Sequence, residues 1–296
     1  MNIALYIVCN NKAVLMANVL LYSFKKHNPW FDGDVVVLHD DGHCILSESA
    51  KDTMRMYHED IIFKKAVSED YDTLFNRICS TLGDSSRYRT LPCIYKWDMF
   101  RDSKYDRIIY MDTDILPLNS MKASMDYCDH HNFLAAADSV DWSMSKYKGH
   151  YPAGSAVGTR GGEFNGGLYV VGGEYISDDF FSELLRYAEL TDFRKFYKKL
   201  GKGRIGEQAF LSNFMREHSY YILSSEYNRI RRVIPDSLIL RKPNLLQTIK
   251  NVHYTSKKPM NPNSDRIRLN GVWRSYKEIN DVWRDACVEA GQSLAL

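Results

Sequence analysis

Long apolar runs are missing from this 296-residue sequence, and none approaches the roughly 18 residues that span a bilayer. The first residues, MNIALYIVCNN, contain no basic segment followed by a cleavable apolar stretch, which argues against a signal peptide. The six cysteines are scattered without a C-x-x-C pair, and no N-x-[ST] glycosylation site occurs. Free thiols in a reducing compartment are the ordinary state of such cysteines. We therefore expect a cytoplasmic protein with no transmembrane segment.

An excess of charge of one sign is also missing. The 39 Lys and Arg residues nearly balance the 37 Asp and Glu residues, for a formal net charge of +2. This balance argues against a nucleic-acid-binding protein held by a basic face, and against an acidic solvating tail. The 45% hydrophobic and 26% charged residues are those of an ordinary globular protein that buries a sizeable core.

The first 115 residues alternate between strand and helix patterns. We expect strands at 3–9, 34–40, 60–67 and 106–112, and helices at 12–27, 48–58 and 87–102, with Pro92 near the start of the last. Such alternation predicts an α/β fold with a mainly parallel central sheet flanked by helices. Ligands of such sheets bind beyond the carboxyl ends of the strands.

The pattern is less regular after residue 115. We expect strands at 131–138 and 164–173, a short strand opening 251–260, and helices at 176–190, 206–217 and 275–290. Residues 139–163 are rich in Gly, Ser and Tyr and predict a long loop over a site. The amphipathic segment 272–290 fits a packing helix better than an interfacial anchor. No repeat or linker divides the chain, so we expect a single domain, residues 1–296, with a less regular C-terminal third.

Two aspartates stand at the end of one expected strand. In YDRIIYMDTDILPLN (105–119) the apolar run leads directly into Asp112 and Asp114. Residues i and i+2 of an extended strand point to the same side, so the two carboxylates can converge on one cation. Hard carboxylate oxygens suit Mg²⁺ or Mn²⁺, which also bind phosphate oxygens of substrates. In the alternative interpretation, one aspartate caps the following turn and the other is solvated.

A nicotinamide dinucleotide site is not expected, although GKGRIG (201–206) matches G-x-G-x-x-G. That fingerprint follows a strand, whereas the preceding segment DFRKFYKKL is basic and not strand-like. The glycines fit a loop that leads into the helix expected at 206–217.

Three later segments carry polar residues at the ends of expected elements. FNGGLYVV places Asn165 and two glycines at a strand start, where the backbone can approach a ligand closely. GEQAFL places an acid and an amide at a helix N-terminus. VHYTSKKP ends a strand with His253 and two lysines, which can supply a metal ligand and cations for a phosphate. A lone histidine is otherwise an ordinary core or surface residue.

Taken together and in this order, these segments resemble glycosyltransferase family 8. This is a group of retaining enzymes with the GT-A fold that includes glycogenin and bacterial lipopolysaccharide galactosyltransferases. The resemblance runs from YIVCNNKAVLMANVLLYSFKKHNP through KWDMFRDSKYDRIIYMDTDILPL and FNGGLYVV to GEQAF and VHYTSKKP, most of the chain. It implies a UDP-sugar-dependent hexosyltransferase with a carbohydrate or glycan acceptor. Residues 1–115 would form its nucleotide-binding half and 116–296 its sugar and acceptor half.

The resemblance also implies a metal centre. Asp112 and Asp114 match the family's D-x-D, with Thr113 between them, and His253 matches its third protein ligand. In the family these ligands hold Mn²⁺ on the diphosphate of the donor, and Mg²⁺ is the alternative. Because imidazole is softer than carboxylate, the histidine favours Mn²⁺.

Other positions match the family's donor site. Catalytic roles are implied for Gln208, near the anomeric carbon, for Asp138, which lines the donor sugar, and for Lys96, which contacts donor phosphate or sugar. The remaining implied donor-binding residues are Val8, Cys9, Asn10 and Asn11 around uracil and ribose, Asn165, Gly166 and Gly167 around the sugar, Glu207 where the family usually has Asp, and Lys258 of the terminal Lys-Pro pair.

The sequence departs from the family pattern near its C-terminal motif and near the base. The stretch from His253 to Lys-Pro lacks the usual Gly and is one residue shorter, which leaves Lys257 and Lys258 as alternative phosphate contacts. Because Pro259 biases the residue before it toward an extended backbone, we expect Lys258 to be the contact. Val14 stands where glycogenin has an aromatic residue near the base, and FNGGLY has Gly where glycogenin has Ser.

The chemistry expected from these residues is sugar transfer. Departure of UDP leaves negative charge on a diphosphate, which a divalent cation and lysines stabilise without a strong general acid. The remaining task is to position the acceptor hydroxyl. The alternatives are a non-catalytic nucleotide-sugar-binding protein of the same fold and a sugar-phosphate nucleotidyltransferase. The latter needs a Gly- and Arg-rich loop directly after the first strand, and CNNKAVLMAN offers none.

Overall fold

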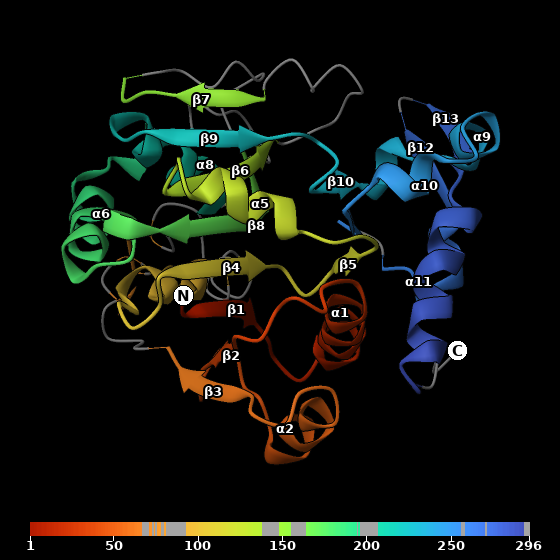
Figure 1. Ribbon diagram of the computed structural model, residues 1–296, viewed down its shortest axis with the longest axis horizontal. Helices are drawn as coiled ribbons and strands as arrows, with labels where there is room; N and C mark the ends of the chain where they lie inside the picture. Colours follow the sequence, from red (N-terminus) through yellow and green to blue (C-terminus); the bar gives the residue numbers. More distant parts are fainter. Residues whose placement is uncertain are drawn as a thin grey trace.

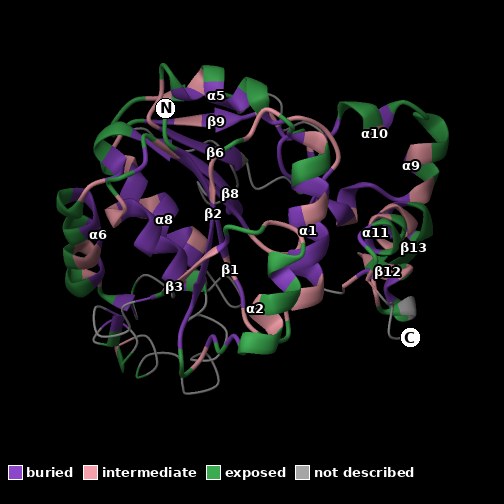
Figure 2. Ribbon diagram, turned by 60° about the horizontal axis from the view of Figure 1, so that its bottom comes forward, coloured by how far each residue is buried: buried purple, intermediate pink, exposed green. Residues whose placement is uncertain are grey.

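The computed structural model describes residues 1–66, 71–72, 74, 76–77, 80, 93–137, 148–154, 164–193, 195, 207–255, 258–269 and 271–292. An eight-stranded sheet with the strand order β3-β2-β1-β4-β8-β6-β9-β7 crosses its centre. Helices cover both faces of this sheet, and the strands are almost entirely buried between them (Figures 1 and 2).

One half of the sheet is purely parallel. It consists of β1 (Ile3–Val8), β2 (Asp34–His39), β3 (Ile62–Lys65) and β4 (Arg107–Met111). All three strand pairings in this half are parallel. The connecting helices α1 (Val14–His27) and α2 (Glu48–Arg55) lie on one face. Buried runs such as DVVVLH make such strands because both faces are covered. These elements confirm the expected strand and helix alternation.

The other half of the sheet is mixed. It contains β6 (Phe133–Ala137), β7 (Gly149–Tyr151), β8 (Phe164–Gly172) and β9 (Tyr220–Leu223). β8 runs antiparallel to both β4 and β6, and β7 runs antiparallel to β9. An antiparallel β8 begins where the parallel β4 ends, so the FNGG segment lies beside the aspartates. The sheet is therefore mainly parallel, as expected, with two strands reversed.

One sequence expectation for this region is wrong, and another holds over its described part. The helix expected at 87–102 has three α-helical residues and then the 3-10 helix η2 (Lys96–Arg101), so Lys96 lies in its 3-10 part. Pro92 lies outside the described residues. The expected loop 139–163 contains the edge strand β7, which pairs with β9. A three-residue strand has too few residues for a period of two to be visible in the sequence.

Helices on the second face are α6 (Asp178–Leu190) and α8 (Glu207–Phe214), whereas α5 (Lys122–Cys128) packs on β8 and β6 and shares a core cluster with α1. The Ser177 hydroxyl caps α6 by accepting from the Phe180 amide at 3.2 Å. The expected helix 206–217 is α8 continued by the 3-10 helix η5 (Met215–Glu217). The short 3-10 helices η4 (Gly173–Tyr175), η6 (Arg231–Val233) and η7 (Pro262–Ser264) form connections.

A second, three-stranded sheet pairs a strand of the C-terminal third with the strand that follows the two aspartates. It has the order β10 (Arg229–Ile230), β11 (Asn251–His253) and β5 (Ile115–Pro117). β11 pairs antiparallel with β5, and this register places His253 opposite Ile115. The short strand expected at the start of 251–260 is thus confirmed. Its pairing brings the C-terminal motif next to the aspartates, which precede β5.

The C-terminal region adds helices and a hairpin. These are α9 (Asp236–Arg241), α10 (Leu245–Thr248), β12 (Arg266–Leu269), β13 (Val272–Ser275) and α11 (Lys277–Glu289). α11 buries Ile279, Trp283 and Cys287, so the amphipathic pattern of 272–290 is largely that of a packing helix, as expected. Within the described ranges, no helix has the length and apolar character needed to cross a membrane.

Candidate active site

Three potential metal ligands converge at the carboxyl end of β4. Asp112 and Asp114 follow β4, and His253 ends β11. Each offers one ligand atom, and these atoms lie within 4.8 Å of one another. The Nε2 atom of His253 is 3.0 Å from Oδ1 of Asp114 and 3.8 Å from Oδ2 of Asp112. The sequence prediction that these residues meet is therefore matched by their geometry.

The aspartates are not needed to close the turn that follows the strand. The amide of Ile115 donates to the backbone carbonyl of Asp112 at 3.0 Å, so backbone atoms make the turn. Oδ1 of Asp112 instead accepts from the hydroxyl of Tyr110 at 2.6 Å. The turn-cap interpretation thus loses its main support. Thr113 lies at the turn between the carboxylates and is partly exposed.

Positive charge surrounds Asp114. Burial raises the pKa of this carboxyl, but the opposing His253 and Lys258 outweigh it and the pKa is lowered. Burial lowers the pKa of His253, but Asp114 and Asp112 outweigh it and the pKa is raised. Lys258 donates to Oδ2 of Asp114 and, at 3.2 Å, to the carbonyl of Tyr254. Asp114 is therefore held ionised, which is the form of a carboxylate that binds a metal.

The donor set fits a divalent cation. Two carboxylates and one imidazole suit Mn²⁺ or a similar ion. The Nδ1 atom of His253 is buried, and no described atom is its hydrogen-bond partner. A Cβ on Gly167 would lie 2.4 Å from Cε1 of His253, so only glycine lets the imidazole ring pack this closely on β8. The ring is thus held by packing against β8, with Nε2 directed toward the two aspartates.

Lys96 links the metal-ligand cluster to the donor-site segments. Its ammonium is buried and donates to the Gly166 carbonyl at 2.6 Å. It also lies 3.0 Å from Oε2 of Glu207 and 3.7 Å from Oδ1 of Asp112. Burial lowers the pKa of Lys96, but the two carboxylates outweigh it and the pKa is raised. A permanent positive charge therefore stands behind Asp112.

Glu207 and Gln208 begin α8 and face the start of β8. Glu207 is buried and accepts from the indole of Trp97 at 3.1 Å. Burial raises its pKa above the ordinary glutamate value, against the opposing effect of Lys96. Oε1 of Gln208 accepts from the amide of Gly166 at 2.9 Å. The helix start thus fixes the backbone of the FNGG segment.

Asn165 shapes the same segment from within. Its Oδ1 accepts from the amide of Gly167 at 2.8 Å and from Nδ2 of Asn228 at 2.6 Å. The amide of Asp112 donates to the carbonyl of Gly167 at 2.9 Å, which ties this segment to the D-x-D. Asn228 is fully buried and was not anticipated from the sequence, because no motif surrounds it.

The predicted base-binding residues lie at the carboxyl end of β1, the strand beside β4. Val8 ends the strand, and the buried Cys9 donates its amide to the Leu38 carbonyl at 3.1 Å. Oδ1 of Asn10 and of Asn11 accept from backbone amides at 3.0 and 2.8 Å. These residues are at the same sheet edge as the aspartates. Asp138, Lys257 and the segment 201–206 lie outside the described residues.

The C-terminal end of the site is anchored by Arg284 of α11, a contact that the sequence did not predict. Nε of Arg284 donates to the carbonyl of Pro259 at 3.1 Å, and its guanidinium pairs with Asp265 at 2.8 Å. Pro259 follows Lys258 directly, so Arg284 restrains the backbone that carries this lysine. No local pattern marks Arg284, because the contact joins residues far apart in sequence.

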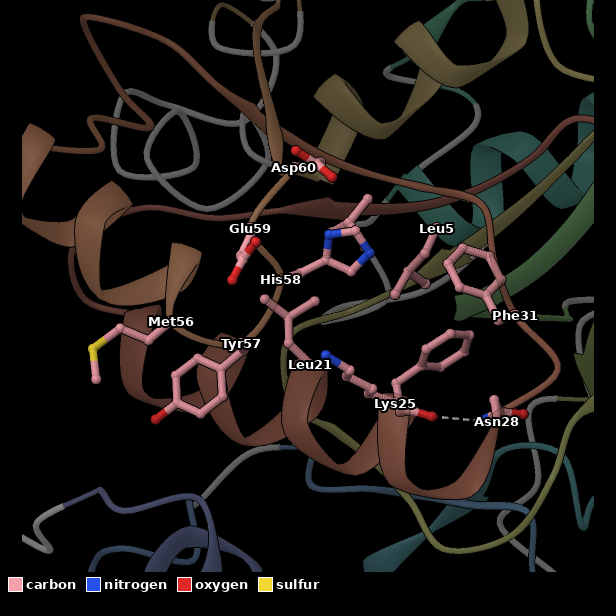
Figure 3. Close-up of a pocket in the computed structure, with 12 residues that line it drawn as sticks. Leu5, Leu21, Lys25, Asn28, Phe31, Met56, Tyr57, His58, Glu59 and Asp60 are labelled. Atoms are coloured by element: carbon pink, nitrogen blue, oxygen red, sulfur yellow. Dashed lines mark hydrogen bonds between the residues drawn. The ribbon is translucent and has the colours of Figure 1, made fainter.

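A separate pocket of about 410 Å³ lies away from this cluster. Residues of α1 and of the segment after α2 line it, with Leu5 and Val35 from the sheet (Figure 3). None of the predicted site residues lines it.

The fold is that of the GT-A glycosyltransferases. The galactosyltransferase LgtC, solved with donor and acceptor sugar analogs, matches with a TM-score of 0.63 and 15% identity over 97% of this chain and 95% of its own. Mouse xyloside xylosyltransferase 1 has a TM-score of 0.55 and 15% identity, covering 86% of this chain and 98% of its own. GlyE from Streptococcus pneumoniae has a TM-score of 0.57 and 16% identity over 96% of this chain and 60% of its own. No family model and no curated protein sequence matches.

Proposed function

We propose that this chain is a glycosyltransferase that moves a hexose, or a related sugar, from a UDP-sugar to an acceptor hydroxyl. The observation that carries the proposal is the convergence of Asp112, Asp114 and His253 at the carboxyl edge of a GT-A sheet. LgtC, which shares this fold, is a galactosyltransferase solved with donor and acceptor sugar analogs. In this proposal residues 1–115 hold the nucleotide, and 116–296 hold the sugar and acceptor.

A divalent cation, Mn²⁺ with Mg²⁺ as the alternative, would be held by the two aspartates and the histidine. When bound, it neutralises charge that builds on the diphosphate as UDP leaves. The protein supplies a second source of positive charge in Lys258, whose ammonium lies beside the carboxylate of Asp114. We assign Lys258 to the donor diphosphate, as its place beside Asp114 supports.

Lys96 has a different role in the proposal. Its ammonium is enclosed by Gly166, Glu207 and Asp112, so it holds these three groups in register. Such preorganised charge needs no rearrangement when the leaving group develops its own charge. Lys96 can thereby orient the backbone at Gly166, which is proposed to line the donor sugar. From the same location its positive charge can stabilise the donor phosphate.

Gln208 is proposed to lie beside the anomeric carbon, together with Asn165, Gly166 and Asp138. Gln208 already anchors the Gly166 amide, which places its amide group at the start of β8. LgtC also has a glutamine in its active site, since one matched structure carries an active-site change from glutamine to glutamate. A neutral amide there can support the reacting centre without acting as a base, which favours transfer with retention.

The competing function is a nucleotide-sugar-binding protein of the same fold without turnover. It predicts the same metal and UDP affinity but no release of UDP. A panel of UDP-sugars, each incubated with Mn²⁺ and possible glycan acceptors, separates the two by measuring UDP release and by NMR of the first-formed product. UDP release with an α-linked first product supports the retaining transferase. Tight UDP-sugar binding with no release supports the binding protein, and a β-linked first product refutes retention.

A further inference from the structure

Two buried tyrosines lie next to each other in the central sheet, beside the candidate metal centre. Tyr110 on β4 is the register partner of Tyr169 on β8, the neighbouring strand of the sheet (Figure 1). Their ring centres lie 5.9 Å apart, and both side chains are fully buried. Because residues two apart in extended chain point to the same side, Tyr110 lies on the side of the sheet toward which Asp112 points. The two rings therefore lie directly behind this candidate metal ligand.

The two rings flank the buried ammonium of Lys96. Its Nζ atom lies 4.7 Å from the centre of the Tyr110 ring and 5.6 Å from that of the Tyr169 ring. A cation at this distance over an aromatic face is attracted to the ring. The Gly166 carbonyl holds the same ammonium at 2.6 Å. Lys96 is thereby kept 3.7 Å from Oδ1 of Asp112, beyond the length of a direct hydrogen bond.

The hydroxyls of the two tyrosines have different partners. The Tyr110 hydroxyl lies 2.6 Å from Oδ1 of Asp112, whereas the Tyr169 hydroxyl lies 3.5 Å from Oε1 of Glu207. An ionised carboxylate only accepts hydrogen bonds, so Tyr110 is the donor to Asp112. The other oxygen of Asp112, Oδ2, is left facing Nε2 of His253 at 3.8 Å. Tyr110 therefore contacts a candidate metal ligand, while Tyr169 contacts the neighbouring glutamate.

We propose that Tyr110 is a positioning residue that determines which oxygen of Asp112 faces the metal. Because the hydroxyl holds Oδ1, Oδ2 is left to converge with Nε2 of His253 and Oδ1 of Asp114, which lie 3.0 Å apart. Partners that hydrogen-bond a metal-ligating carboxylate orient it in this way. This role rests on the proposed function, since it requires a metal at the site.

Tyr110 and Lys258 hold the two aspartates in different ways. Lys258 is a partly exposed cation that donates to Asp114, so a bound metal competes with it for that carboxylate. The Tyr110 hydroxyl is neutral and lies buried behind Asp112, so it holds Oδ1 without repelling a metal at Oδ2. Removal of the lysine should therefore strengthen metal binding, and removal of the tyrosine hydroxyl should weaken it.

Tyr110→Phe tests this role in the full chain, because it removes one hydroxyl and keeps the ring beside Lys96. Without the hydroxyl, Asp112 can turn toward the Lys96 ammonium and away from His253. Mn²⁺ should then bind about ten- to a hundredfold more weakly, which the electron paramagnetic resonance signal of free Mn²⁺ measures. With Co²⁺ in place of Mn²⁺, the visible absorption bands, which report the geometry of the ligands, should change as well.

Tyr169→Phe is the matched control, since it removes the hydroxyl of the paired ring. It should keep the Mn²⁺ affinity and the Co²⁺ bands of the wild type, and the two variants should have similar melting temperatures in EDTA. Equal Mn²⁺ affinity in wild type and Tyr110→Phe, or an equal loss in Tyr169→Phe, overturns the role of Tyr110 and leaves the proposed sugar transfer standing. So does a lower melting temperature of Tyr110→Phe alone with unchanged Co²⁺ bands. A wild type that binds no Mn²⁺ overturns the metal centre, and the role of Tyr110 with it.

Discussion

Lys258 donates a hydrogen bond to Oδ2 of Asp114, one of the three candidate metal ligands. The other oxygen of that carboxylate contacts His253 at 3.0 Å. A lysine assigned to the diphosphate and a carboxylate assigned to the metal are thus direct partners. A divalent cation and an ammonium compete for the oxygens of Asp114. The binding of the metal and the binding of the UDP diphosphate should therefore be coupled through Lys258.

This coupling predicts opposite effects for one substitution. In Lys258→Ala, Asp114 loses a competing cation, so Mn²⁺ alone should bind about threefold tighter. UDP binding in the presence of Mn²⁺ should weaken about ten- to a hundredfold, because a charge-assisted contact to phosphate is lost. Isothermal titration of each ligand measures both changes. Lys257→Ala is the control and should change neither. Equal losses for the two variants, or weaker Mn²⁺ binding in Lys258→Ala, would contradict the assignment.

Gly167→Ala tests how closely His253 must approach β8. The new Cβ would meet Cε1 of His253 at 2.4 Å and Oδ1 of Asn165 at 3.0 Å. The imidazole must then move away from β8 and out of its present position beside the aspartates, and activity should fall about a hundredfold. Gly42→Ala is the matched control, because its Cβ would meet Oδ2 of Asp40 at an ordinary 3.8 Å. Unchanged Mn²⁺ affinity in Gly167→Ala would show that His253 does not bind the metal.

The fold was largely predictable because its parallel strands are buried apolar runs. IALYIVC and DVVVLH have no other stable environment than a sheet covered on both sides. The direction of β8 was not predictable, since FNGGLYVVGG reads the same in a parallel or an antiparallel strand. The short strands β7 and β10 and the hairpin β12–β13 are fixed by pairing with distant residues.

The site was predictable where chemistry lies at strand ends. The two aspartates follow an apolar strand and His253 ends another, so polar groups at these positions can be recognised in the sequence as candidate ligands. Asn228 and Arg284 contribute only through tertiary hydrogen bonds, to Asn165 and Pro259, and carry no local signal. The partner of Lys258 was likewise not foreseen, because the sequence indicates a cation but not the anion beside it.

The Asp114–His253 pair predicts a pH window for stability without metal. His253 has a raised pKa, so its contribution is complete below the unfolded value of 6.5 and is lost as pH rises through the raised pKa. Asp114 has a lowered pKa, so its contribution is present above 3.8 and is lost as pH falls through the lowered pKa. In EDTA, the Asp114–His253 pair should therefore raise the melting temperature most between pH 3.8 and pH 6.5.

His253→Asn provides the comparison for that window. Its melting temperature should lie below that of wild type inside the window and approach it at higher pH. Mn²⁺ affinity of the wild type should rise with pH, because metal binding displaces the proton from the imidazole. A constant difference in melting temperature at all pH values would show that the pair does not titrate as its contacts imply.

Glu207→Gln tests the buried ion pair that holds Lys96. Glu207 and Lys96 are both almost fully buried and lie 3.0 Å apart. Removing one charge of such a pair typically costs about 3–5 kcal/mol, because the other charge stays buried. Urea unfolding should show a loss of this size. Lys277→Ala, which breaks an exposed pair with Asp281, should shift the urea midpoint little. Equal midpoints for Glu207→Gln and wild type would mean that Asp112 alone satisfies Lys96.

The measurement that tests the central claim most directly is UDP release from a UDP-sugar in EDTA-treated protein before and after addition of Mn²⁺. The account predicts no release in EDTA, recovery with Mn²⁺, and no recovery in Asp112→Asn or Asp114→Asn variants that still unfold cooperatively. Full release in EDTA, or full Mn²⁺-dependent release in both variants, would contradict a metal-dependent sugar transfer at this site.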